Sequence, residues 1–254
     1  MTAIRVSNVS KRYGDVAALS ALSLTVPEGE LFGLLGPNGA GKTTTIRICT
    51  GQLVPDDGEV TVLGTDPTSN GVETRRRVGV LPERESPPSF LTPREYFAFV
   101  GTVREMDEET VRGRVATWAD RLAFRERLDT LVTDLSRGQQ QKVMIAGAFL
   151  HEPSLVFIDE PLANLDPIMQ ERVKEFLTGY VERGNTVFLS THYIETAEQL
   201  CTRVGIVDGG EVIAERDPST LADGESLLDL FVANVDADAD ADAGDAVRKR
   251  RREV

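Results

Sequence analysis

Long apolar runs are missing from this sequence, and that absence limits where the chain can reside. A helix that crosses a bilayer takes roughly 18 to 20 mostly apolar residues, and no segment of the chain reaches that length. The N-terminus, MTAIRVSNVSKRYG, also has no continuous apolar stretch of the kind found in secretory signals. We therefore expect the chain to stay in the cytoplasm.

Cysteine is also scarce. Cys49 and Cys201 are far apart, and neither belongs to a CxxC or Cys/His spacing of the kind that holds a metal. Two such thiols exclude a disulfide framework and suit a reducing compartment. Because both lie in apolar-patterned segments, we expect them to be small core residues.

Basic residues are too few to balance the acids, and lysines are few beside arginines. The formal net charge is −13 over 254 residues. A body of that sign repels phosphate backbones at long range, so we expect no nucleic-acid partner. The hydrophobic share of 41% is ordinary for a globular protein that buries a sizeable core.

The pattern of apolar residues predicts an α/β fold. Two strands, 4–9 and 22–27, are joined through a polar turn at 13–15 and suit a small antiparallel sheet. Four short apolar strands follow, at residues 30–36, 78–81, 155–158 and 186–190. Helical patterns separate the last two, which implies that they pair in parallel. A hairpin around Asp208-Gly209-Gly210 comes after the last of these.

Between residues 86 and 150 the pattern becomes helical. Thr92, Pro93 and Glu95 have the spacing of a helix start with a capping box. We interpret 86–150 as a helical insertion in one domain that spans 1–234. Within 235–254 an alternating Asp/Ala run from Asp236 to Asp245 precedes RKRRR at 248–252, which predicts a disordered tail.

The segment Gly36–Thr43, GPNGAGKT, fits the phosphate-binding loop (P-loop) pattern G-x-x-x-x-G-K-[ST] without a mismatch. A strand precedes it and a helix follows, which makes an accidental glycine turn a poor alternative. Lys42 would bridge the β- and γ-phosphates, and Thr43 would ligate Mg²⁺. The loop contacts expected for the nucleotide are Gly36, Pro37, Asn38, Gly39, Ala40, Gly41, Lys42, Thr43 and Thr44.

Two acids, Asp159 and Glu160, follow the strand 155–158. Ligands collect at the carboxyl ends of strands in open α/β sheets. We expect Asp159 to hold Mg²⁺ through water and Glu160 to polarise the attacking water. The alternative is that these carboxylates only cap the next helix.

LSRGQ, at 135–139, precedes another helical pattern. Ser136 and Gln139 have the spacing of a capping box, which is a purely structural interpretation. The same geometry offers a hydroxyl and free N–H groups at a helix N-terminus, where a γ-phosphate would fit.

Taken together, these motifs resemble those of the ATP-binding-cassette (ABC) family, from Ile4 to about Glu215. The resemblance implies a P-loop NTPase core with a mostly parallel sheet, an N-terminal antiparallel β subdomain and an inserted helical subdomain. It implies that Ser136, Gly138 and Gln139 contact ATP held by a second cassette. It also implies that Tyr13 stacks on adenine and that His192 joins Lys42 and Glu160 in the catalytic set. His151 matches no motif, and we expect it at the surface.

Some positions depart from the family pattern. Arg137 replaces a usual glycine in LSRGQ, and Ala163 and Asn164 stand where serine and glycine are common. Glu83 occupies the position of a glutamine that approaches Mg²⁺, so we include it as a metal residue. No departure removes a catalytic group.

The resemblance implies the ATP-hydrolysing subunit of an ABC transporter, which dimerises around two ATP. Its partners would be a second cassette and a transmembrane permease subunit at the inner face of the membrane. Within the family, the sequence resembles exporter-type cassettes whose membrane subunits are separate chains, so we expect export. The alternative is a soluble ABC ATPase that acts on ribosomes or DNA, which usually has two cassettes in one chain or a long coiled-coil insertion.

The acidic balance predicts a need for molar salt. The Debye length grows from about 3 Å at 1 M to about 30 Å at 0.01 M salt, so unscreened carboxylates repel each other within and between chains. We expect ATPase activity to fall before circular dichroism changes as KCl is lowered. Full activity at about 0.1 M salt would contradict this prediction.

Overall fold

A computed structural model describes residues 1–83, 86–162, 164–221 and 226–233. The predicted tail, 235–254, and Ala163 lie outside the described residues. Within the described ranges, no helix is long and apolar enough to cross a membrane.

The N-terminal sheet has three antiparallel strands in the order β2-β1-β4. They are β1 (Thr2–Tyr13), β2 (Val16–Pro27) and β4 (Asp57–Val62). β1 and β2 are both longer than predicted, with 12 residues each. The register shifts between Val6 and Val9, around Asn8 with its positive φ of 50°, and this irregularity hides the second half of β1 from an alternating pattern.

The large sheet has six strands in the order β5-β6-β7-β3-β8-β9. Its strands are β3 (Leu31–Leu35), β5 (Val78–Leu81), β6 (Leu155–Asp159), β7 (Thr186–Thr191), β8 (Arg203–Asp208) and β9 (Glu211–Arg216). All neighbours pair in parallel except β8 and β9. The expected hairpin is confirmed: Gly209 and Gly210 form its two-residue turn with φ of 52° and 85°, as a type I′ turn requires.

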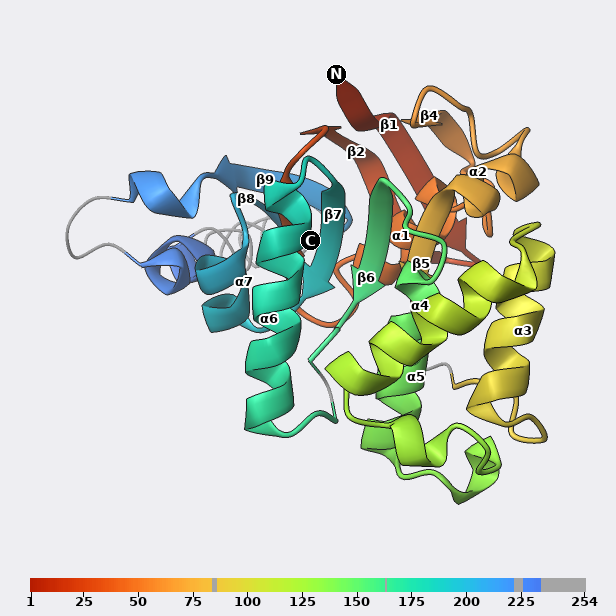
Figure 1. Cartoon of the computed structure of the whole chain (residues 1–254). Coiled ribbons are helices and arrows are strands. Elements are labelled where there is room, and N and C mark those ends of the chain that lie inside the picture. Colours follow the sequence, from red (N-terminus) through yellow and green to blue (C-terminus); the bar gives the residue numbers. More distant parts are fainter. Residues whose placement is uncertain (84–85, 163, 222–225, 234–254) are drawn as a thin grey trace, which may run out of the picture.

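In Figure 1 the helices of the segment 86–150 gather beside the large sheet, and the helices that follow β6 and β7 cover its front. The first group contains α3 (Pro93–Val103), α4 (Glu108–Arg121) and α5 (Arg137–Phe149), and the second contains α6 (Pro167–Glu182) and α7 (Ile194–Leu200). α1 (Lys42–Cys49) packs in the core between the two sheets, and α2 (Gly71–Arg77) precedes β5. The predicted capping box is present at the start of α3, where Thr92 and Glu95 each bond the other's backbone.

Two hydrophobic cores hold these layers together. One lies between the sheets and contains Ile4, Phe32 and Phe157. The other lies under the helices and includes side chains of α3, α4, α5 and α6 together with Leu35 and Val187 of the large sheet. The helices between 86 and 150 therefore pack as part of one continuous core with the sheet.

Cys49 and Cys201 are free and buried, as predicted. Burial raises the pKa of the Cys49 thiol to about 12. The prediction for His151 was wrong, because the turn between α5 and β6 brings its ring against β5, where Nε2 lies 3.2 Å from the carbonyl oxygen of Val78. Burial, followed by the charge of Arg104, lowers the pKa of His151 to about 4.

Replacing Phe188 on β7 tests how much the core between the sheets contributes to stability. Phe188 is fully buried, and its ring centroid lies 5.6 Å from that of Phe32 and 5.5 Å from that of Phe157. Phe188→Ala should lower the free energy of unfolding by about 3–5 kcal/mol, measured by urea denaturation. Phe90→Ala, at a ring that is 76% exposed, is the matched control and should change it little.

Candidate functional site

The P-loop connects the end of β3 to the start of α1, and two of its glycines, Gly36 and Gly41, have no room for a side chain. A Cβ on Gly36 would collide with the carbonyl oxygen of Val207, and one on Gly41 would lie 2.6 Å from that of Ala18. Gly39 and Gly41 have φ of 90° and 105°, which favours glycine. The sequence folds here into a tight loop that approaches its neighbours closely and leads into a helix N-terminus.

Lys42 begins α1 and is 7% exposed. Its Nζ donates hydrogen bonds to the carbonyl oxygens of Gly36, at 2.7 Å, and Pro37, at 3.0 Å. Burial lowers its pKa, while the negative charges of Glu160, Asp159 and Glu83 act in the opposite direction. The ammonium group thus lies inside the loop and close to three acids, so the structure brings these four predicted residues together.

Thr43 and Asp159 meet at the mouth of the P-loop. The Thr43 hydroxyl donates a hydrogen bond of 2.7 Å to Oδ2 of Asp159, which is almost fully buried at the end of β6. In the described part of the chain, no group of three or more His, Cys, Asp or Glu side chains could hold a metal. A pair of oxygen ligands fits Mg²⁺, which usually takes one or two protein carboxylates and completes its shell with water and substrate phosphates.

Glu160 points away from Thr43, toward the end of β7. Its Oε1 accepts hydrogen bonds from the backbone N–H of His192, at 2.9 Å, and lies 2.6 Å from Nδ1 of the same residue. Its Oε2 accepts a bond of 3.1 Å from the hydroxyl of Thr191. Glu160 itself has a positive φ of 53° and is 6% exposed. The carboxylate is therefore clamped on both oxygens, whereas the His192 side chain is 41% exposed.

Among the described residues, no hydrogen bond links the side chains of Ser136 and Gln139 in the LSRGQ segment to this group. Ser136 is the N-cap of α5, and its capping box with Gln139 is complete, at 3.3 Å and 2.9 Å. Within the described residues, the side-chain hydrogen bonds of Ser136 and Gln139 stay inside this box. Gly138 instead faces the carbonyl oxygen of Asn164, since a Cβ there would approach it to 2.8 Å. The structure does not join these three residues to the P-loop of the same chain.

Tyr13 ends β1, and its side chain is 47% exposed. Glu83 follows β5. The remaining loop residues, Asn38, Ala40 and Thr44, lie between β3 and the first turn of α1.

Sequence reasoning missed two contacts at the site. Thr191 bonds Glu160, and the nearly buried Gln141 donates a hydrogen bond of 3.4 Å to the carbonyl oxygen of Pro161, so that α5 is tied to the loop after Glu160. Because Thr191 directly precedes the predicted site residue His192, its position in the sequence could have indicated that it lies at the site. The sequence around Gln141 gives no such indication, because Gln141 is one of several polar residues in a helical pattern.

Residues 19–163 match the family model described as ABC transporter. The chain belongs to the ABC transporter family. This cassette is the ATP-binding subunit of an ABC transporter, and it hydrolyses ATP to ADP and phosphate.

Among curated relatives, the cassette is 38% identical over 223 residues to the Nod factor export ATP-binding protein I of Rhizobium etli, covering 88% of this chain and 71% of that protein. The protein of the same name from Burkholderia orbicola is 36% identical, over 88% of this chain and 74% of the relative.

Solved structures agree with the fold. The ATP-binding subunit of an ABC transporter superposes with a TM-score of 0.84 at 30% identity, over 91% of this chain and 99% of that one. A dimeric ATP-binding cassette in a post-hydrolysis state, bound to ADP and Pi, superposes with a TM-score of 0.79 at 27% identity, over 85% and 98%. The α/β cassette fold predicted from the sequence is confirmed.

Gly36→Ala tests the P-loop of the cassette. The added methyl group would collide with Val207, and overpacking of this kind costs about 1–3 kcal/mol. We expect ATP affinity, measured by equilibrium dialysis, to fall about tenfold or more. Gly113→Ala on α4, where no atom lies within 4 Å of the new Cβ, should bind ATP normally. Wild-type affinity in a folded Gly36→Ala protein would contradict the geometry.

Proposed function

We propose that two copies of this cassette close head to tail around two ATP molecules and two Mg²⁺ ions, and so drive a separate transmembrane permease that exports its cargo. The observation that carries the proposal is the separation within one chain. Lys42, Asp159 and Glu160 converge at the P-loop, while Ser136 is exposed at the start of α5 and hydrogen-bonds within its own capping box. A nucleotide that contacts both the P-loop and the LSRGQ segment would therefore take the LSRGQ contact from a second copy.

In this proposal the P-loop, with Gly36, Pro37, Asn38, Gly39, Ala40, Gly41 and Thr44, holds the phosphates through backbone N–H groups at the start of α1. Lys42 exchanges its bonds to the Gly36 and Pro37 carbonyls for bonds to phosphate oxygens. Thr43, Asp159 and Glu83 would hold Mg²⁺, which when bound neutralises charge on those oxygens.

Glu160 acts as the residue that orients and polarises the attacking water. Its carboxylate accepts from His192 and Thr191, so its direction is fixed before ATP arrives. His192 positions Glu160 through Nδ1 and keeps an exposed ring edge for the γ-phosphate.

The second cassette supplies Ser136, Gly138 and Gln139. The Ser136 hydroxyl and the first N–H groups of α5 lie at the positive end of a helix dipole, which favours a phosphate. Tyr13, on the antiparallel sheet, would stack its exposed ring on adenine.

Exposed apolar side chains support a docking surface for the permease. Phe90, Phe99 and Val103 are 76%, 58% and 48% exposed, and all three lie at the start of the helical segment or on α3. Large apolar side chains left exposed on one short segment, 90–103, are where a protein partner would gain by covering them. A permease docked there would hold the cassette at the inner face of the membrane, and the names of the curated relatives favour export. In this proposal, residues 1–234 form the ATP-binding domain, with 86–150 as the helical insertion.

Glu160→Gln tests the proposal. The amide keeps the shape of the side chain but cannot polarise water as a carboxylate does, so hydrolysis should slow by roughly 10²- to 10⁴-fold while ATP still binds. We expect an ATP-bound dimer to accumulate, visible by size-exclusion chromatography in Mg-ATP.

Glu175→Gln, at an exposed acid of α6, is the matched control and should hydrolyse ATP at the wild-type rate. A Glu160→Gln protein that stays monomeric with ATP bound would argue against the closed dimer, and fast hydrolysis would argue against the role of Glu160.

A further inference from the structure

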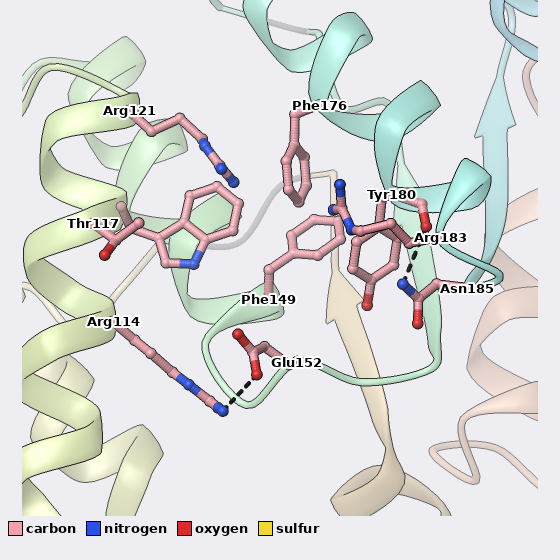
Figure 2. A pocket seen from close by; sticks show the side chains of 10 residues that line it. Arg114, Thr117, Arg121, Phe149, Glu152, Phe176, Tyr180, Arg183 and Asn185 are labelled. Carbon is pink, nitrogen blue, oxygen red and sulfur yellow. Dashed lines mark hydrogen bonds and ion pairs between the residues drawn. The ribbon is translucent and has the colours of Figure 1, made fainter.

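A groove of about 450 Å³ lies between α4 and α6, and no residue of the P-loop lines it (Figure 2). Trp118 and Arg121 reach it from α4, Phe176 and Tyr180 from α6, and Phe149 from the end of α5. The groove therefore joins the helical segment to a helix of the sheet core.

Aromatic rings form the wall of this groove. The ring centroids of Phe149 and Phe176 are 4.8 Å apart, those of Trp118 and Phe176 are 4.9 Å apart, and those of Phe149 and Tyr180 are 5.1 Å apart, all edge to face. The Tyr180 hydroxyl donates a hydrogen bond to the carbonyl oxygen of Pro153, which fixes that ring. The wall is a packed, apolar surface whose shape does not depend on a ligand.

Two guanidinium groups extend over this wall, one from the last residue of α4 and one from the residue after α6, as Figure 2 shows. The Arg121 guanidinium lies 4.8 Å from the Phe176 ring centroid and 5.0 Å from that of Trp118, and Arg183 lies 5.8 Å from that of Tyr180. A third arginine of the groove, Arg114, is already paired with Glu152 at 2.6 Å.

The charge of Arg121 and Arg183 is not balanced locally. In the part of the chain that the structure describes, neither forms an ion pair with a carboxylate, although the whole chain carries 41 acids against 28 basic residues. Burial and then the positive charge of Arg183 lower the pKa of Arg121. Two like charges that face one groove are relieved by an anion that binds both, and guanidinium groups bind phosphates and carboxylates in a two-pronged manner.

We propose that this groove binds a small aromatic anion, a phosphate or a carboxylate, whose charged group bridges Arg121 and Arg183 while its ring packs against Phe176 and Tyr180. Asn185, whose side-chain amide already donates to the Tyr180 carbonyl oxygen, leaves its own carbonyl oxygen at the rim to accept from a hydroxyl of the ligand. Such a ligand would tie α4 to α6, the helix that starts directly after Asp166 and the catalytic loop.

The chain contains one tryptophan, Trp118, and it lies in this groove, so intrinsic tryptophan fluorescence reports on the site. Phenyl phosphate, benzoate and the neutral benzyl alcohol are the probes, each titrated into the whole chain. We expect a saturable change with at least one anion and weaker binding of benzyl alcohol. Arg121→Gln and Arg183→Gln should each weaken the anion about tenfold, the effect of one lost charge-assisted hydrogen bond.

Arg172→Gln, which removes the same charge from an exposed position of α6 outside the groove, is the matched control and should bind normally. Lys42→Ala should also bind normally, because the P-loop is not the site measured. Phenyl phosphate and benzoate separate a phosphate site from a carboxylate site, and an arginine-dependent response to either supports the proposal. A response that is absent, that benzyl alcohol matches, or that survives both groove substitutions would overturn it, as would an equal loss in Arg172→Gln.

Discussion

The parallel register of β3, β6 and β7 is the constraint on which the catalytic half-site depends. Asp159 on β6 and Leu34 on β3 both pair with Ser190 on β7, so the three strands end at one edge of the sheet. The segments that leave those ends carry the P-loop, Glu160 and His192. Thr43 and Asp159, 116 positions apart in the sequence, are hydrogen-bonded for this reason.

Charge burial at that edge shapes the chemistry. Lys42, Asp159 and Glu160 are each less than a tenth exposed, and buried charges are costly unless they are paired. Each has partners: backbone carbonyls for Lys42, the Thr43 hydroxyl for Asp159, and His192 with Thr191 for Glu160. One ammonium stands against two buried carboxylates, so the pocket has an excess of negative charge that a cation would offset. The left-handed backbone of Glu160 is a further local cost of holding its side chain in this direction.

Elements whose position depends on a local pattern of residues were predicted correctly from the sequence. The four buried strands were found almost to the residue, because short apolar runs bounded by glycine or polar residues leave little choice. Both capping boxes were found for the same reason. β4 was missed because its segment, DGEVTV, is half polar, and it forms only because β1 offers an edge to pair with. The position of His151 and the contact from Gln141 to Pro161 depend on how distant elements pack, which no local pattern records.

Two glycines from distant parts of the chain pack against the same strand. Gly41 of the P-loop and Gly210 of the β8–β9 turn both press on Ala18 of β2, at distances too short for a methyl group, and the Ser20 N–H donates to the Gly210 carbonyl oxygen at 3.0 Å. The P-loop and the β8–β9 turn therefore pack against the same stretch of β2, and neither glycine leaves room for a side chain there. A larger residue in the hairpin turn would displace the strand against which the P-loop packs, so a substitution far from the nucleotide in the sequence would disturb the loop that holds it.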